Sequence, residues 1–392
     1  MTTRANKSIA AGSSRRTFLA ATAAVSASGL FPRDLVAAPQ AKEIQLDTVS
    51  FQPTLYHGWP TLARRKSGEL LLVCSGGREA HVCPFGRVEL MTSKDGGQTW
   101  SFPRTLLDSA IDDRDAGVLE TTKGTLLVTT FTSLAYEPLL KNGSESGKWA
   151  NDKLARWQGV QARTTPEQRR ADLGVWMIRS TDGGLTWSPR YDVPVNSPHG
   201  PIQLRDGRLL YPGKDLWRTG TKVGVCESKD DGVTWQWLAE IAPRSGDKHT
   251  EYHELHGVET AKGKLIVHIR NHNQPNAGET LQTESEDGGR TWTAPHSIGV
   301  WGLPSHLLRL RDGRLLMSYG HRRPPFGNQV RLSEDEGQTW SDAIVISNDG
   351  PGGDLGYPST VELDDGSLVT AWYEVRPGSS ASILRQARWK LG

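Results

Sequence analysis

Polar and charged residues recur immediately before each of six glycine turns, and these side chains are suited to binding or transforming a polar ligand. Such groups, gathered at the centre of a fold, are costly unless a polar ligand or one another satisfies them. A ligand site is one interpretation, and structural ion pairs along a channel are the alternative. The segments are Tyr56-His57-Gly58-Trp59-Pro60, Asp112-Asp113-Arg114-Asp115, Ser197-Pro198-His199-Gly200, Glu254-Leu255-His256-Gly257, Pro304-Ser305-His306 and Gly356-Tyr357-Pro358.

A second set of basic and polar residues ends the strands that follow these turns. If the strands are arranged around an axis, both sets line one mouth of a central channel. The second set comprises Gly76-Gly77-Arg78, Lys214-Asp215, His268-Ile269-Arg270-Asn271-His272, His321-Arg322-Arg323 and Trp372-Tyr373-Glu374.

The elements that must position these residues are repeated hairpins. Each hairpin has a glycine turn followed by an apolar strand, and successive turn glycines are separated by 56, 83, 56, 50 and 53 residues. Six repeats of short strands predict an all-β fold, a six-bladed β-propeller. The turn glycines are Gly68, Gly124, Gly207, Gly263, Gly313 and Gly366.

A second repeat, S-x-D-x-G-x-T-W, occurs five times. Asp and Gly supply turn chemistry, and Thr-Trp begins a β-branched and aromatic strand. We expect each copy to form the turn between the third and fourth strands of a blade, away from the chemistry. The copies begin at Ser93, Ser180, Ser228, Ser285 and Ser333.

The sixth repeat ends without this phrase, so its outer strand must come from elsewhere. Residues 42–52 alternate as a strand should, and we expect them to close the ring by pairing with the last blade. The propeller then spans residues 42–392.

The long interval between the second and third turn glycines indicates an insertion at about residues 136–172 in blade two. We expect a loop there with a short helix, which Thr165 caps before Pro166. A lid over the site and a surface decoration are both open interpretations.

The N-terminus resembles an export signal. Arg15 and Arg16 form a twin-arginine pattern, and a short apolar run and small residues follow them. We interpret residues 1–38 as a removed signal that sends the protein to the periplasm or the extracellular space. The run is too short for stable membrane insertion. An uncleaved anchor or a disordered tail is the alternative.

Net charge and cysteine content argue against several classes of protein. The net charge of +2 argues against a nucleic-acid partner, which would call for a basic excess. Three cysteines are too few and too odd in number for a disulfide framework. No spacing typical of a metal site or a cofactor site occurs, so none is predicted, although a structural calcium held by loop carboxylates stays open. Oligomeric state has no signature in the sequence.

The repeated phrases and the six-blade count resemble the sialidase (neuraminidase) superfamily, whose repeats are called Asp boxes, over about residues 50–390. By this resemblance Tyr357, nine residues before Gly366, is the nucleophile, and Glu254, nine before Gly263, is its base. Arg270, seven residues after Gly263, matches a substrate arginine. The resemblance implies a glycoside hydrolase that acts at a chain end on an acidic glycan or oligosaccharide.

The chemistry of an acidic sugar suits this pair. Sialic acid carries a carboxylate on its anomeric carbon, which would repel an anionic nucleophile. A neutral phenol deprotonated by a neighbouring Glu avoids the clash. Arginines can then clamp the carboxylate with bidentate bonds.

Two positions depart from the family pattern. The first arginine of the family is replaced by Gly58, and the loop between Arg78 and Arg87 holds no Asp to act as the acid. His81 is the nearest replacement for that acid, and Glu79 is second. The third arginine matches only loosely, to Arg322 or Arg323. Further candidate substrate-binding residues are Arg78, Arg114, Asp115 and His199.

These departures keep two other functions open. A Tyr and a His facing a uronate also suit β-elimination, in which one group removes the proton beside the carboxylate and the other protonates the leaving oxygen. A polysaccharide lyase is therefore one alternative, and a sugar-binding propeller without catalysis is another.

Overall fold

The computed structural model describes residues 39–50, 52, 54–217, 222–379 and 381–392. The predicted export signal, residues 1–38, lies outside the described residues. Among the helices that are described, none has the length and apolarity needed to cross a membrane.

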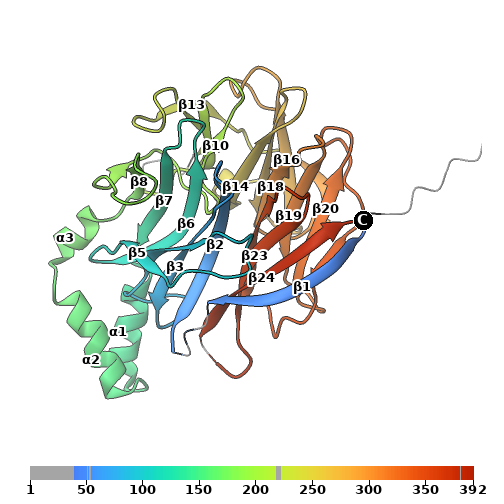
Figure 1. The fold of residues 1–392 in the computed structure, drawn as a ribbon. Helices are drawn as coiled ribbons and strands as arrows, with labels where there is room; N and C mark the ends of the chain where they lie inside the picture. Colours follow the sequence, from blue (N-terminus) through green and yellow to red (C-terminus); the bar gives the residue numbers. More distant parts are fainter. Residues whose placement is uncertain (1–38, 51, 53, 218–221, 380) are drawn as a thin grey trace, which may run out of the picture. The chain divides into compact units, whose positions relative to one another are not determined.

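Six antiparallel four-stranded sheets form the blades of a β-propeller, as predicted (Figure 1). Blades one to three comprise β2 (Tyr56–Arg64), β3 (Leu70–Arg78), β4 (Arg87–Ser93), β5 (Arg104–Leu107), β6 (Asp112–Glu120), β7 (Leu126–Ser133), β8 (Val175–Ser180), β9 (Tyr191–Asp192), β10 (Ile202–Gln203), β11 (Leu209–Lys214), β12 (Val223–Ser228) and β13 (Gln236–Glu240). Blades four to six comprise β14 (Tyr252–Glu259), β15 (Leu265–Asn271), β16 (Glu279–Ser285), β17 (His296–Trp301), β18 (Ser305–Arg309), β19 (Leu315–His321), β20 (Gly327–Ser333), β21 (Ile344–Ser347), β22 (Leu355–Glu362), β23 (Leu368–Val375), β24 (Ser382–Leu391) and β1 (Ala41–Ser50).

The six turn glycines join the first and second strands of each blade. All six have φ between +77° and +93°, a left-handed conformation that glycine takes without steric cost. The sequence spacing of these turns therefore fixes where every inner strand ends.

The Asp boxes lie between the third and fourth strands, and their hydrogen bonds explain the repeated residue types. In the first box Ser93 donates to Asp95, and the Thr99 N–H and hydroxyl donate to the same carboxylate at 2.9 and 2.6 Å. These bonds, those from Thr99 above all, lower the pKa of Asp95 to about 2. Each box is thus a self-contained turn.

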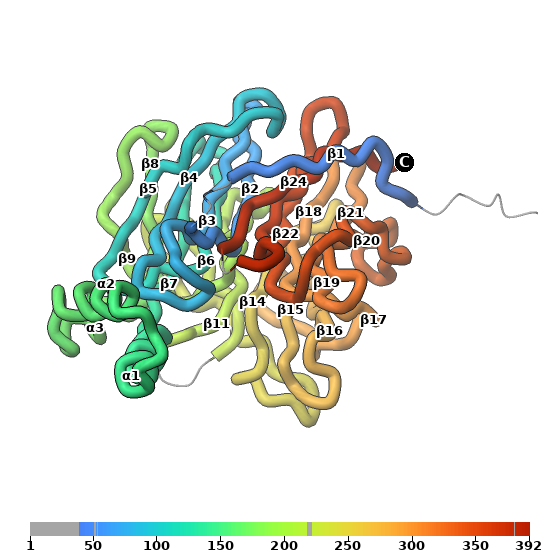
Figure 2. Tube along the Cα trace, turned by 90° about the horizontal axis from the view of Figure 1, so that it is seen from below, coloured from blue at the N-terminus to red at the C-terminus, as the bar shows by residue number. Residues whose placement is uncertain are grey.

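The N-terminal strand β1 closes the ring by pairing with β24, the last strand of blade six (Figures 1 and 2). The register places Leu46 opposite Ala387 and Asp47 opposite Gln386. This confirms the prediction that an N-terminal segment supplies the missing strand. The edge of the last blade is paired as a result.

The hydrophobic core lies between adjacent blades and not within them. Six clusters of buried apolar side chains each combine residues from two neighbouring blades. The cluster between blades one and six joins Tyr56, Trp59 and Leu70 to Tyr357 and Tyr373. Burial of each such side chain contributes roughly 1.5–3 kcal/mol, so the first and last blades are held together by apolar packing as well as by β1.

The insertion in blade two is mostly helical, whereas the sequence predicts one short helix there. It comprises α1 (Tyr136–Ser146), α2 (Asn151–Gln161) and α3 (Pro166–Ala171), which lie together on one side of the propeller (Figure 1). Thr165 caps α3 as predicted, and Gln168 completes a capping box. The buried residues Tyr136, Leu140 and Trp157 anchor α1 and α2 through a small core of their own.

Candidate active site

The side chains at the centre of the candidate site come from the same position on several inner strands. It lies nine residues before the turn glycine, and in four blades the residue there has a positive φ of 38–55°: Trp59 (68 − 59), Asp115 (124 − 115), Glu254 (263 − 254) and Tyr357 (366 − 357). Each coincides with a shift in strand register, which re-aims a side chain. Such backbone strain costs on the order of 1–3 kcal/mol per residue and is typical of functional sites.

Tyr357, Glu254 and Arg270 form the centre of this arrangement. The Tyr357 hydroxyl donates to Glu254 Oε1, and Arg270 Nη1 forms an ion pair with Glu254 Oε2. Arg270 Nη1 also lies 3.3 Å from the Tyr357 hydroxyl oxygen. Three residues from blades four and six therefore share one hydrogen-bond network, and all three are sequence-predicted site residues.

The pKa shifts in this network set its resting protonation state. Burial raises the pKa of Tyr357 well above its ordinary value, and the charges of Glu254 and Asp115 raise it further. Burial alone would raise the pKa of Glu254, but Arg270 and the Tyr357 hydrogen bond outweigh it and lower that pKa. The resting pair is a neutral phenol donating to an ionised carboxylate.

Arg322 and Arg323 lie in different surroundings, although the sequence left them equivalent. The Arg322 guanidinium carbon is 5.6 Å from the centroid of the Tyr357 ring, and its Nε donates to the Leu355 carbonyl at 2.8 Å. Its Nη2 is buried without a protein partner. Arg323 is exposed and stacks on Trp301 at 3.6 Å. Of the two, only Arg322 lies over the Tyr357 ring, and only Arg322 has a buried donor without a protein partner.

Asp115 is a buried carboxyl group near this network. Its exposed fraction is 6%, and burial raises its pKa to about 7, with Glu254 adding to the shift and Arg114 opposing it. Such a group carries a proton over much of the neutral range, as a general acid must.

Arg78 and Arg114 are both held by the protein close to the Trp59 ring. Arg78 is fully buried, and its Nη1 and Nη2 bind the Asp112 carboxylate at 2.5 and 2.9 Å. Arg114 donates to the His81 carbonyl at 3.2 Å, and its guanidinium carbon lies 4.4 Å from the Trp59 ring centroid. Because protein acceptors engage both side chains, their contacts favour positioning of the His81 loop, and direct substrate binding by either stays a prediction.

His81 stands at the rim of the site and is oriented by Asp354. Its Nδ1 lies 3.1 Å from Asp354 Oδ1 and 2.9 Å from the Tyr56 hydroxyl, and its ring meets Trp59 edge-on at 5.0 Å. Tyr373 also donates to Asp354, at 2.9 Å. Burial alone would raise the pKa of Asp354, but the bonds from His81 and the two tyrosines lower it. The His81 side chain is 46% exposed.

The helical insertion packs against the loop that carries His81. Trp157 Nε1 and Arg156 Nε donate to the two carboxylate oxygens of Glu79 at 3.0 and 2.7 Å. Cys83 is buried in the same small core as Trp157, and the Phe85 ring meets Trp157 edge-on. Glu79, the second candidate for the acid, is therefore engaged by the insertion, and the lid interpretation stays a prediction.

His199 lies in the channel with two further histidines. The His256 and His306 rings stack at 4.6 Å, and His199 meets both edge-on and lies 6.4 Å from Tyr357. Burial lowers the pKa of His199 well below its ordinary value, so its ring is neutral. His199 is buried, with an exposed fraction of 2%, and its role in substrate binding stays a prediction.

Sequence reasoning missed Asp354, and it placed Tyr56, Trp59 and Tyr373 in the channel-lining segments without giving any of them a role. The nine-residue spacing that selects Tyr357 and Glu254 also selects Trp59, so one signal was available. Gly58 precedes it where the family has arginine, and a Cβ at Gly58 would lie 3.0 Å from the Tyr56 ring. Aromatic rings thus occupy the side where an arginine is missing. No local pattern marks Asp354.

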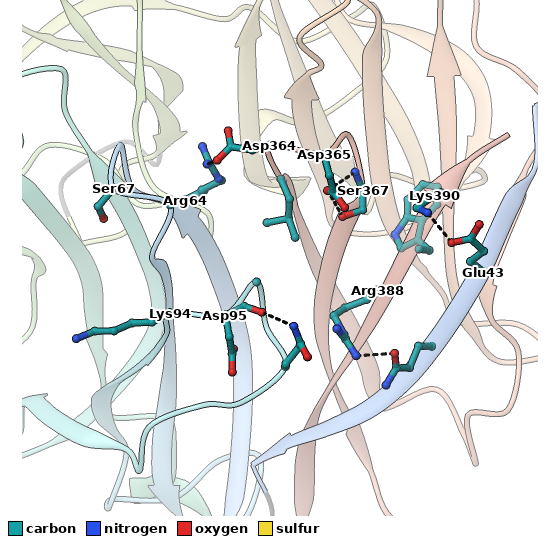
Figure 3. A pocket seen from close by; sticks show the side chains of 16 residues that line it. Glu43, Arg64, Ser67, Lys94, Asp95, Asp364, Asp365, Ser367, Arg388 and Lys390 are labelled. Atoms are coloured by element: carbon teal, nitrogen blue, oxygen red, sulfur yellow. Dashed lines mark hydrogen bonds and ion pairs between the residues drawn. The ribbon is translucent and has the colours of Figure 1, made fainter.

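A separate polar cavity of about 550 Å³ lies at the other end of the strands, where blades one and six meet (Figure 3). Its lining residues belong to the glycine turns and the strand ends beside them, the first Asp box, β1 and β24. Arg64 pairs there with Asp364, and Lys390 with Glu43. Its charges largely neutralise one another, and it contains none of the predicted site residues.

Comparisons with known proteins agree with this architecture. The family model of the BNR repeat-like domain matches residues 137–370, that is 370 − 137 + 1 = 234 of 392 residues. A sialidase from Clostridium perfringens is 25% identical over 250 residues, which cover 63% of this chain and 50% of that protein. The chain thus spans about half the length of that relative.

Solved structures show the same fold. A Dyadobacter fermentans protein described as of unknown function superposes with a TM-score of 0.72 at 23% identity, covering 89% of this chain and 99% of that one. A Hadza microbial sialidase superposes with a TM-score of 0.59 at 20% identity, covering 85% and 65%. The chain therefore belongs to the family of BNR repeat-like domain proteins and is a divergent member of the sialidase superfamily.

Proposed function

We propose that this protein is an exo-acting glycoside hydrolase that removes a terminal acidic sugar, sialic acid or a related one, with Tyr357 as nucleophile. The observation that carries the proposal is the hydrogen bond from the Tyr357 hydroxyl to Glu254, which Arg270 braces from the other side. Sialidase-named relatives support a glycosidase of this superfamily. The predicted export signal would send the enzyme to glycans outside the cytoplasm.

The proposed reaction uses the resting protonation state directly. As the phenol oxygen attacks the anomeric carbon, its proton passes to Glu254, and the glycosidic bond breaks. Two groups have the chemistry to protonate the leaving oxygen. His81, oriented by Asp354, is one, and the buried carboxyl group of Asp115 is the other. Water then attacks the anomeric carbon and gives a proton to the group that protonated the leaving oxygen, while Glu254 returns its proton to the phenol oxygen and the sugar leaves Tyr357.

Arg270 and Arg322 form the proposed clamp for the substrate carboxylate. A matched pair of variants tests this assignment. Arg322→Ala should raise KM for the acidic substrate about 10- to 100-fold, because a hydrogen bond to a charged group is lost. Arg323→Ala, which removes an equal charge stacked on Trp301, should change KM less than about twofold. Equal effects of the two substitutions on steady-state KM would remove Arg322 from the clamp.

A lyase is the second candidate, and Gly58 is the observation that favours it. The missing arginine and the Tyr56 and Trp59 rings beside this position suit a substrate with a differently placed carboxylate, such as a uronate. Tyr357 and His81 would then serve as base and acid of a β-elimination. A sugar-binding propeller without catalysis is the third possibility.

One assay separates the three functions. We expect incubation with sialyl oligosaccharides to release free sugar, detected by chromatography. A rise in ultraviolet absorbance from an unsaturated uronate, on glucuronyl oligosaccharides, would assign the lyase. Binding of either glycan with no product would assign the non-catalytic propeller.

A further inference from the structure

Beside the candidate active site, one hairpin brings together a carboxylate and two imidazoles. Glu251 ends a 3-10 turn (His249–Glu251), His253 lies in β14, and His272 follows β15. One potential ligand atom from each lies within 4.8 Å of the others, the one such group found among the described residues. Two His and one Glu are the protein ligands of many zinc sites that keep a position open.

The backbone holds these three residues in place before any ion binds. The His272 N–H donates to the Glu251 carbonyl at 2.8 Å, and the β14–β15 register places His253 opposite Arg270. The His253 and His272 rings lie 4.5 Å apart, tilted by 37°. A preorganised hairpin of this kind lowers the entropic cost of gathering metal ligands.

We propose that Glu251, His253 and His272 form a binding site for a divalent transition-metal ion of the zinc type. The ligand set of two imidazoles and a carboxylate suits this class of ion better than calcium or magnesium, which prefer oxygen ligands alone. The remaining coordination positions would be filled by water or by an oxygen of a ligand.

The site is coupled to the active site through Arg270. Arg270 Nε donates to His272 Nε2 at 2.7 Å, so that nitrogen presents its lone pair to the guanidinium, and a neutral ring carries its proton on Nδ1. A metal on Nε2 takes this lone pair. A metal on Nδ1 moves the proton to Nε2, which then cannot accept from Arg270. Either way, metal binding breaks one of the contacts that position Arg270, while the ion pair between Arg270 Nη1 and Glu254 stays in place.

Two cations limit the affinity of this site. Arg270 is one, and the other is Lys214, which donates to the Thr250 carbonyl at 2.6 Å and interacts electrostatically with Glu251. Both repel a divalent ion, while Glu251 and Glu254 attract it. We therefore expect a reversible, inhibitory site more than a permanently filled one. Zn²⁺ should raise KM for the acidic substrate because Arg270 loses its His272 contact, and this kinetic effect rests on the proposed function.

The decisive experiment measures metal binding without reference to catalysis. Untagged protein is titrated with Zn²⁺ by calorimetry, and with Co²⁺ by visible absorption. We expect one equivalent of each to bind. Glu251→Gln and His253→Ala should each weaken binding at least about tenfold. His296→Ala is the matched control, because His296 lies on the outer strand of the same blade and pairs there with Glu284, which is not one of the three proposed ligands.

The outcomes distinguish the site from its effect on turnover. Unchanged affinity in Glu251→Gln and His253→Ala, or equal loss in His296→Ala, would overturn the metal site whether or not the protein is a hydrolase. If one equivalent binds and KM for the active substrate rises in the native protein but not in Glu251→Gln, the coupling is supported. Binding that leaves KM unchanged would overturn the coupling through Arg270.

Discussion

Tyr357→Phe is expected to lower kcat by at least about a thousandfold while the propeller stays folded. The substitution removes the oxygen that attacks the anomeric carbon and leaves a ring of nearly the same size. Burial of the ring in the cluster between blades one and six is retained, so stability should change little. Turnover of an acidic glycoside, with circular dichroism as the folding check, measures both quantities.

Tyr319→Phe is the matched control for this prediction. Tyr319 is also buried, and its hydroxyl contacts Gln329 and Arg331 in blade five, away from the Tyr357 network. Its variant should keep nearly full kcat. Full turnover by Tyr357→Phe would contradict both the hydrolase mechanism and the lyase alternative, because both require the hydroxyl oxygen of Tyr357.

Glu254→Gln is expected to lower kcat by about 10²–10⁴-fold, the range of a lost general base. The amide keeps the shape of the side chain but cannot take the phenol proton, and it leaves Arg270 without its anionic partner. Because Tyr357 and Glu254 act as a unit, the double variant should be scarcely slower than the slower of the two single variants. Additive losses in the double variant would show that the two residues act independently.

The pH profile provides a second measurement on the same pair. The pKa of Glu254 is lowered from 4.5, so the base stays ionised until the pH falls below that value, and activity should decline there. Folding stability should change with pH in the same direction. A carboxyl group whose pKa is lowered in the folded state stabilises the fold when it is ionised, and this stabilisation is lost as the pH falls and the group takes up a proton. If Asp115 is the acid, activity should also decline above about pH 7. A basic limb that persists in Asp115→Asn would show that Asp115 is not the group responsible for it.

The fold was predictable because short sequence motifs specify its turns, and these motifs recur from blade to blade. Turn glycines such as Gly68 and Gly263 need a left-handed φ that few other residues tolerate, so counting them counts blades. The strand at residues 42–52 was predictable by elimination, since it had no blade of its own. The insertion was less so, because α1 and α2 are stabilised by contacts with the loop around Cys83, which no helical periodicity records.

The candidate site was predictable only where the distance in sequence from a turn glycine determines which way a side chain points. Tyr357 and Glu254 lie at one register position, and the shared strand geometry brings them together. The Asp354–Tyr56 contact joins residues 298 positions apart, and no local pattern records it. The sequence likewise could not separate Arg322 from Arg323, since the difference lies in which ring each guanidinium meets.

The pairing of β1 with β24 has a consequence for when the proposed activity can appear. Leu46 meets Ala387 across 387 − 46 = 341 residues of chain, the kind of contact whose loop-closure entropy delays its formation. Tyr357 belongs to the blade that this contact completes, and Glu254 lies two blades away. We expect a partly synthesised chain to have no activity. During refolding, the time at which activity appears should therefore report when β1 pairs with β24.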